Sequence, residues 1–235
     1  MRYVIGDIHG CHKEFHELLD KLCLSEEDTL YILGDVMDRG PEPLKVLQEL
    51  MRNPNVIYLL GNHDLAFYLM MKRLAVEVVE ENVESQLDAD ILLDFLQWSM
   101  DGGAVSAQQF RHLSKEEREE ILSYLEEADL YDVLEDGKKR YILVHGALGN
   151  FSEEKSLDEY EISELIEDRM DYSRRYFADP DTYIITGHTP ATHISGWKKP
   201  EVYQKHGHIA MDTGCVGTGI LAAYCIETGE VIYNK

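Results

Sequence analysis

The sequence predicts an α/β fold in which buried strands alternate with helices. One observation is a series of short apolar runs, rich in β-branched and aromatic residues, each of which ends abruptly at a cluster of glycine, histidine or aspartate. A second is the amphipathic stretch between the first two runs, which makes a strand–helix–strand unit. The length of 235 residues suits one sizeable domain, and two independent domains are not the default at this length. We therefore expect a single domain over residues 1–235.

Polar side chains follow each of the apolar runs that we expect to be buried strands. The runs cover residues 3–5, 30–33, 56–60, 141–144 and 183–185. In α/β folds, binding and catalytic groups gather beyond the carboxyl ends of the strands. The side chains that follow these runs are therefore the first candidates for a functional site.

Helices are expected between the strands, and a hairpin is expected at the end of the chain. Residues 13–24 carry apolar side chains at helical spacing, and residues 44–51 repeat the arrangement after Pro41 and Pro43. Pro54 then breaks the chain before the third strand. Gly229 and Glu230 predict a turn before the apolar residues 231–233, which favours a closing hairpin.

A longer segment, from residue 65 to about residue 134, is helical in pattern and acidic. One apolar face is supplied by Leu92, Leu93, Phe95, Leu96 and Trp98. We expect a helical lid or subdomain here, although simple packing on the sheet explains most of these residues equally well. The acidic runs are typical of a solvated face. Trp98 with the glycines at 102 and 103 either lines a substrate groove or belongs to a packed helix that the glycines end.

The composition excludes some partners and predicts a location. Acidic residues outnumber basic ones 45 to 22, and a formal charge of -23 argues against binding to a nucleic-acid polymer or to an anionic membrane. The first residues lack a secretory pattern, and charged residues interrupt every apolar stretch. The four cysteines form no C-x-x-C pair, so we expect reduced thiols in a soluble, cytoplasmic protein. A phosphate-bearing substrate would need metal ions or arginines to attract it locally.

The polar residues at the predicted strand ends have the chemistry of a metal site. They are Asp7, His9, Asp35, Asn62, His63, His145 and His188. Oxygen and imidazole donors without a thiolate suit Mn, Fe or Zn, and the number of ligands implies two ions. Asp35 is the natural bridge because a carboxylate has two oxygens. A lone buried histidine is more often a satisfied core residue, so we assign no role to His12, His16, His112, His193, His206 or His208.

Six ordered motifs carry a family resemblance. The segments GDIHG at residues 6–10, GDVMDRG at 34–40 and GNHD at 61–64 resemble the signature blocks of the phosphoprotein phosphatases, within the calcineurin-like metallophosphoesterases. Three shorter motifs continue the resemblance in order: HG at 145–146, GHT at 187–189 and DTG at 212–214. The length is similar to that of the compact bacterial and bacteriophage lambda serine/threonine phosphatases. The third block ends in Asp64 where these phosphatases usually have Glu.

The resemblance implies a role for each matched residue. Asp7, His9 and Asp35 would hold one metal ion, and Asp35, Asn62, His145 and His188 the other, with Mn²⁺ expected and Fe or Zn as alternatives. His63 would be the general acid and Asp38 would orient its ring. Arg39 and Asn62 would bind the substrate phosphate. A second phosphate-binding arginine is expected at Arg169, with Arg174 and Arg175 as the alternatives.

The resemblance leaves the substrate less certain than the chemistry. Phosphoserine and phosphothreonine in a phosphoprotein or phosphopeptide are the leading substrates, and small aryl phosphates are expected in vitro. The alternative is a symmetrical diadenosine tetraphosphate hydrolase, a sister branch that GNHD and the DTGC of residues 212–215 also resemble. Asp38 and the short length argue for the phosphatase branch. A non-catalytic metal-binding scaffold is disfavoured, because every candidate ligand and the acid are present.

These observations lead to one prediction for the whole chain. We predict a metallophosphoesterase sandwich in which two mixed β-sheets face each other and helices cover the outsides (α/β/β/α). The metal site lies at one edge, in the loops after the strands. The reaction is the hydrolysis of a phosphate monoester by in-line attack of a hydroxide that bridges the two ions.

Overall fold

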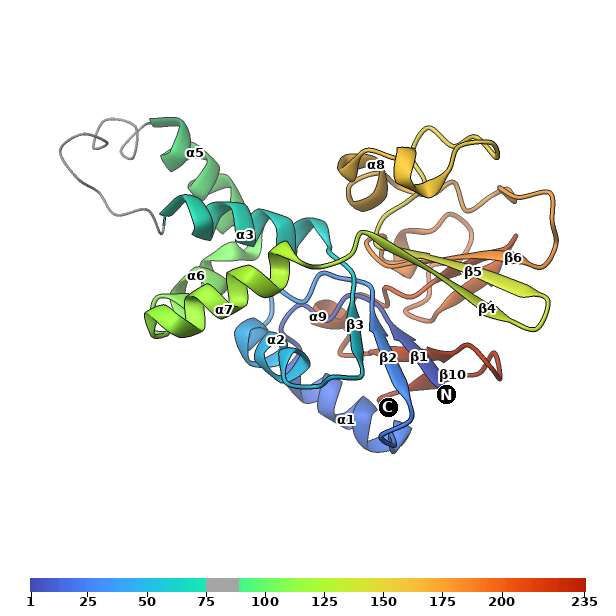
Figure 1. Cartoon of the computed structure of the whole chain (residues 1–235), viewed down its shortest axis with the longest axis horizontal. Coiled ribbons are helices and arrows are strands. Elements are labelled where there is room, and N and C mark those ends of the chain that lie inside the picture. Colours follow the sequence, from blue (N-terminus) through green and yellow to red (C-terminus); the bar gives the residue numbers. More distant parts are fainter. Residues whose placement is uncertain (75–88) are drawn as a thin grey trace.

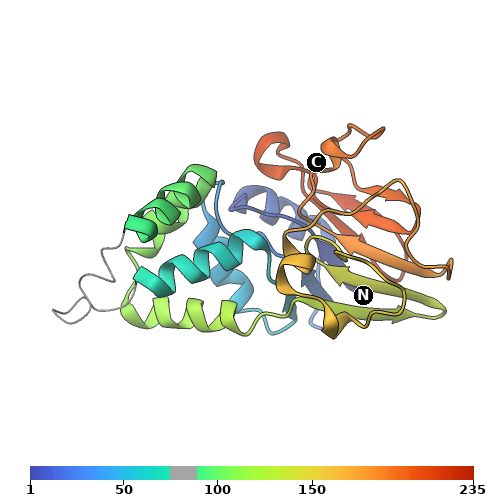
Figure 2. The same ribbon diagram turned by 90° about the horizontal axis from the view of Figure 1, so that it is seen from above.

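The computed structural model describes residues 1–74 and 89–235, and it has the predicted sandwich architecture. Within the described residues, two five-stranded sheets stack face to face and helices lie outside them (Figures 1 and 2). Each sheet contains both parallel and antiparallel neighbours, so both are mixed. The prediction of an α/β/β/α arrangement is confirmed. No helix of the described part of the chain has the length and apolar character that crossing a bilayer requires.

The first sheet has the strand order β10-β9-β1-β2-β3. Its strands are β1 (Arg2–Ile5), β2 (Thr29–Ile32), β3 (Val56–Tyr58), β9 (Ala222–Cys225) and β10 (Val231–Tyr233). β1, β2 and β3 are parallel, because α1 (His12–Leu22) and α2 (Pro43–Met51) provide the crossovers that parallel pairing needs. β9 and β10 form the expected closing hairpin, antiparallel to each other and to β1.

The second sheet has the strand order β4-β5-β6-β8-β7. Its strands are β4 (Tyr131–Asp136), β5 (Lys139–Val144), β6 (Thr182–Thr186), β7 (Tyr203–Lys205) and β8 (His208–Ala210). The central strands β5, β6 and β8 are parallel, and an antiparallel strand closes each edge. The carboxyl ends of β5 and β6 therefore meet at the same edge of this sheet.

Successive side chains of a strand point to opposite faces of its sheet, and this separates two hydrophobic clusters. In β1, Val4 faces the second sheet and lies in a cluster with Tyr141 and Ile185. The next residue, Ile5, faces the helices and lies in another cluster with Phe15 of α1. On the outer face of the second sheet, α8 (Ile162–Ile166) closes a third cluster. The sheets are therefore buried on both faces, which explains the continuous apolar runs in their strands.

Helices fill most of the segment in which a lid was expected. They are α3 (Asn62–Leu74), α5 (Ala89–Trp98), α6 (Ala104–Phe110) and α7 (Lys115–Glu126), and a π-helical turn, η1 (Ser99–Gly103), joins α5 to α6. They extend to one side of the sandwich (Figure 1). Residues 75–88 of the expected segment lie outside the described residues. The end of the segment differs from the expectation, because residues from Tyr131 onward pair along β5 as strand β4.

Candidate metal centre

The strand ends bring the predicted ligands together. Asp7 follows β1, Asp35 follows β2, Asn62 begins α3 after β3, His145 follows β5, and His188 follows β6. Glycines allow the loops to approach one another closely. A Cβ on Gly61 would lie 2.2 Å from an oxygen of Asp35, and a Cβ on Gly187 would lie 2.3 Å from an oxygen of Asp7.

Asp35 lies at the centre of the cluster and faces histidines from both proposed ligand sets. Its Oδ2 is 3.5 Å from Nε2 of His9, and its Oδ1 is 3.4 Å from Nε2 of His145. The backbone N–H of His63 also donates to Oδ1, at 2.9 Å. Asp35 has a φ of 51°, a strained conformation for a residue with a side chain. One carboxylate thus lies between two groups of donors, as the sequence predicted for a bridging ligand.

Three imidazoles are oriented by backbone carbonyls in a way that turns their other nitrogen towards the cluster. His9 Nδ1 lies 2.7 Å from the carbonyl of Met37, and His145 Nδ1 lies 2.7 Å from that of Leu33. On the exposed side, His188 Nε2 lies 3.1 Å from the carbonyl of Glu167. A hydrogen bond from each of these nitrogens places the proton there and leaves a lone pair on the opposite nitrogen. These lone pairs point into the cluster.

Two of these nitrogens, those of His145 and His188, meet at Asn62. Its Oδ1 lies 3.0 Å from His145 Nε2 and 2.9 Å from His188 Nδ1. With the other ring nitrogens bonded to carbonyls, these contacts bring acceptor against acceptor, and such contacts are favourable only when a proton or a cation lies between them. The donor set of imidazole nitrogen, carboxylate and amide oxygen therefore fits a divalent cation such as manganese, iron or zinc.

The ionisable groups of the cluster shift one another's pKa values. Burial raises the pKa of Asp7, and the neighbouring carboxylate of Asp212 raises it further. Burial would also raise the pKa of Asp35, but the neighbouring histidines, His145 foremost, together outweigh it and hold this pKa well below its usual range. Burial would lower the pKa of His145, yet Asp35 raises it to about 10. Without a cation, a proton on His145 therefore neutralises Asp35.

His63 and Asp38 form a hydrogen-bonded pair beside the cluster. Nδ1 of His63 lies 2.9 Å from Oδ2 of Asp38, which is fully buried. Burial would lower the pKa of His63, but the hydrogen bond to Asp38 contributes to raising it above its ordinary value. Asp38 is itself held in place by side chains of the helical segment. Trp98 Nε1 donates to Oδ2 at 2.8 Å, and the Ser106 hydroxyl donates to Oδ1 at 2.6 Å.

Arg39 reaches between the cluster and this pair. Its Nη1 lies 2.9 Å from Nε2 of His9, and its Nη2 lies 2.6 Å from Nε2 of His63. The backbone N–H of Arg39 donates to the carbonyl of Gly102, at 3.1 Å. A Cβ on Gly102 would lie 2.6 Å from Cγ of Arg39, so this glycine is required for the close approach. The helical segment thus supports both Arg39 and Asp38.

Among the arginines weighed for a second phosphate contact, Arg169 lies beside the cluster. Burial lowers the pKa of His188 to about 4, and the positive charges of His145 and Arg169 contribute in the same direction. Arg174 instead pairs with an aspartate in its own loop, at 3.4 Å. Arg175 donates to the backbone carbonyls of residues 179 and 182.

The structure adds residues that the sequence analysis did not single out for the site. Asp64 is buried, and its carboxylate accepts hydrogen bonds from the backbone N–H groups of Asp35, Val36 and Met37. It fixes the loop that carries Asp35, so the unusual Asp of the third block is a positioning residue. Ser106 gave no sequence signal, because it lies 68 residues from Asp38. Trp98 lines a groove and also packs against Gly103.

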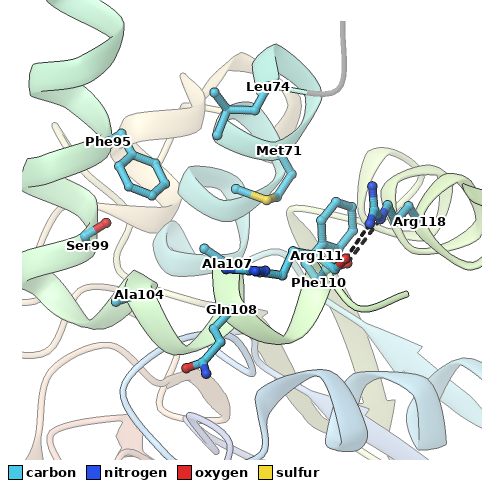
Figure 3. A pocket seen from close by; sticks show the side chains of 10 residues that line it. All are labelled: Met71, Leu74, Phe95, Ser99, Ala104, Ala107, Gln108, Phe110, Arg111 and Arg118. Carbon is cyan, nitrogen blue, oxygen red and sulfur yellow. Dashed lines mark hydrogen bonds between the residues drawn. The ribbon is translucent and has the colours of Figure 1, made fainter. Parts of the chain in front are cut away.

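Two grooves open beside the candidate ligands. The first, of about 560 Å³, lies between α3 and α5 and begins at Asn62 and His63. The second, of about 550 Å³, is lined from Thr189, next to His188, and from Arg169. Figure 3 shows a different cavity, of about 460 Å³, whose lining is mainly apolar. Met71 and Leu74 line it from the other side of α3. The candidate ligands are not among the residues that line it.

Comparison with known proteins relates the whole chain to phosphoesterases. The model of the family described as calcineurin-like phosphoesterase matches residues 2–212. A symmetrical bis(5′-nucleosyl)-tetraphosphatase of Nitrosospira multiformis is 29% identical over 266 aligned residues, which cover 99% of this chain and 95% of that protein.

Solved structures share the fold at low sequence identity. A crystal structure of a protein whose proposed activity is diadenosine tetraphosphatase has a TM-score of 0.64 at 19% identity, over 99% of this chain and 91% of that one. A protein serine/threonine phosphatase from Saccharomyces cerevisiae has a TM-score of 0.53 at 13% identity, over 99% of this chain and 78% of that one. Because the family model spans most of its length, the chain belongs to the calcineurin-like phosphoesterases, a family of metal-dependent hydrolases.

Proposed function

We propose that this chain hydrolyses phosphate esters or anhydrides with two divalent cations held at the strand ends. The observation that carries the proposal is the convergence of imidazole nitrogens on the oxygens of Asn62 and Asp35. In this proposal Asp7, His9 and Asp35 hold one cation, and Asp35, Asn62, His145 and His188 hold the other. When bound, such a pair of cations lowers the pKa of a water molecule towards neutrality and neutralises charge on the phosphate.

The remaining residues have roles in binding and proton transfer. The planar fork of Arg39 binds two phosphate oxygens, and the amide of Asn62 contributes a further contact. His63 donates a proton to the leaving oxygen, while Asp38 holds its ring in place through Nδ1. Arg169 is the second arginine near the phosphate, because its charge acts on His188.

The substrate that we propose is a dinucleoside tetraphosphate, cleaved in the middle. The relative from Nitrosospira multiformis supports this choice, because it matches nearly the full length of both chains. The two grooves of similar volume beside the candidate ligands suit a substrate with two equal halves. In the reaction one water molecule is consumed, one P–O bond of the central anhydride breaks, and two nucleoside diphosphates are released. This reverses the order of preference that the sequence motifs suggested.

A protein serine/threonine phosphatase is the second candidate, and the His63–Asp38 pair favours it. A serine alkoxide is a much poorer leaving group than a nucleoside diphosphate, so its departure needs a positioned general acid. The buried Asp38, with its three side-chain hydrogen bonds, provides such positioning. The alignment of 266 residues to the dinucleotide hydrolase also exceeds the 235 residues of this chain, so the relative carries residues that this chain lacks.

Parallel assays with Mn²⁺ separate the two candidates. We expect the purified chain to convert diadenosine tetraphosphate to ADP with a kcat/KM at least about tenfold above that for a phosphoserine peptide, a difference of about 1.4 kcal/mol in transition-state binding. A reversed preference would transfer the proposal to protein phosphatase activity. Failure to hydrolyse either substrate, or p-nitrophenyl phosphate, with any divalent cation would contradict hydrolysis itself.

A further inference from the structure

We propose that the groove between α3 and α5 binds the nucleoside of the leaving half of the substrate. This inference rests on the proposed function, since it specifies which part of a dinucleoside tetraphosphate occupies the first groove. The groove begins at Asn62 and His63 and has a volume of about 560 Å³. A ligand whose phosphate lies at the cluster can therefore extend into it without leaving the protein surface.

One face of α3 forms a wall of the groove. Asn62, Ala66, Leu69 and Arg73 line it, at spacings of three and four residues that place them in a row along the helix. The row spans about 16 Å, because an α-helix rises 1.5 Å per residue. α5 and η1 supply the opposite wall, in which Trp98 shares the hydrogen-bond partner Asp38 with His63 and Asp101 lies 3.6 Å from His63 Nε2. The groove is thus long enough for a ribose and a base.

The lining favours an uncharged, planar group over a phosphate chain. Leu69 is 55% exposed and, with Ala66 and Met70, offers an apolar surface for a base. Asp94 also lines the groove and would repel phosphates, whereas Asp101 pairs with Arg39, 3.6 Å from its Nη2. Arg73 is already paired with Asp94, at 3.2 Å. Phosphates therefore belong at Arg39 and the cluster, and the nucleoside belongs in the groove.

The position of His63 assigns the groove to the leaving half. His63 lines the mouth of the groove, and a general acid must lie within hydrogen-bonding reach of the leaving oxygen. The group attached to that oxygen then continues into the groove. The half that receives the water lies on the other side, towards the groove lined by Arg169 and Thr189.

The replacement Leu69→Asp tests this assignment. It puts a third carboxylate on the wall and removes the apolar surface, so we expect KM for diadenosine tetraphosphate to rise about tenfold, within the range measured for changes of one apolar contact. The kcat/KM for p-nitrophenyl phosphate should stay within about twofold, because its small leaving group needs little of the groove. The conservative variant Leu69→Met should keep the KM of the parent protein. Leu92→Asp is the matched control, since Leu92 is 59% exposed on α5 and does not line the groove.

Competition separates this inference from the proposed function. Adenosine should inhibit the hydrolysis of p-nitrophenyl phosphate by the parent protein and should lose this effect in Leu69→Asp, whereas inorganic phosphate should inhibit both equally. If diadenosine tetraphosphate is not cleaved but adenosine inhibits through Leu69, the proposed function fails, the assignment to a leaving half fails with it, and the groove remains a nucleoside site. If the dinucleotide is cleaved but adenosine does not inhibit, the groove assignment falls alone. A Leu69→Asp effect confined to a phosphoserine peptide would assign the groove to peptide and also overturn it.

Discussion

At the scale of single residues, Asp35 has the greatest effect on the proposed chemistry. Both of its oxygens face imidazole nitrogens, and it is buried. Asp35→Asn keeps the shape of the side chain but removes the negative charge that two cations would share. We expect the variant to lose bound metal, measured by mass spectrometry of the dialysed protein, and to lose about 100-fold or more in kcat. Asp158→Asn, at an exposed position of the short 3-10 helix Leu157–Glu159, is the matched control and should retain both.

A substitution of His63 tests proton donation separately from metal binding. His63→Asn should retain the parent metal content, because the proposed ligands remain. The general acid contributes about 10²- to 10⁴-fold when the leaving group is poor, so kcat for a phosphoserine peptide should fall by about that factor. The loss for diadenosine tetraphosphate should be smaller, because ADP leaves readily. Equal losses for both substrates would remove His63 from the acid role.

At the scale of elements, the helical segment supports the active side chains. Ser106 of α6 donates to Asp38 and also accepts from its backbone N–H, at 3.0 Å. Ser106→Ala should lower kcat for a phosphoserine peptide by about tenfold, since a hydrogen bond to a charged group contributes about 1.5–3 kcal/mol. KM should change little, and Ser106→Thr should restore part of the rate. An unchanged kcat, with only a lower melting temperature, would mean that Ser106 is purely structural.

The elements themselves could be predicted to very different degrees. β1, β2, β3, β5 and β6 follow from local apolar runs, because a strand buried on both faces has a continuous hydrophobic sequence. Strand β4 was included in the helical segment, because Tyr131–Asp136 is acidic and its pairing with β5 is not visible locally. The contacts of Trp98 and Ser106 with Asp38 span 60 and 68 residues, and only the folded chain brings them together.

The candidate site was more predictable than the fold around it. The proposed ligands lie in short motifs after the strands, and parallel strands bring such motifs to one edge. Asp64 was visible only as an unusual residue beside a ligand, since its role depends on backbone N–H groups that point at it. Arg169, preferred to Arg174 and Arg175 from the sequence, stays a prediction, because all three lie in one irregular loop and their surroundings are not visible locally.

At the scale of the whole molecule, we expect the uptake of metal to be coupled to the release of protons. Asp35 raises the pKa of His145 to about 10 against the effect of burial, so His145 carries a proton near neutral pH when no cation is present. A cation must displace this proton, and its apparent affinity should rise about tenfold per pH unit between roughly pH 7 and pH 9. Calorimetry of Mn²⁺ binding in buffers of different ionisation enthalpy should show proton release. Binding that is independent of pH would contradict the coupling.

The acidic surface of the molecule makes the cluster the place where an anionic substrate gains affinity. The formal charge of -23 repels polyphosphates at long range, whereas in the proposed function Arg39, Arg169 and two cations would attract them locally. This contrast agrees with a small soluble substrate that is held at one point. It also explains why we place only the uncharged nucleoside in the groove of α3 and α5, beside Asp94 and Asp101.

Anomalous diffraction from crystals grown with Mn²⁺ and inorganic phosphate tests the central claim most directly. The account predicts two anomalous peaks roughly 3.5–4 Å apart, one on each side of Asp35, with Asn62, His145 and His188 around one of them. A single peak, or a pair of peaks that does not share Asp35, would contradict it.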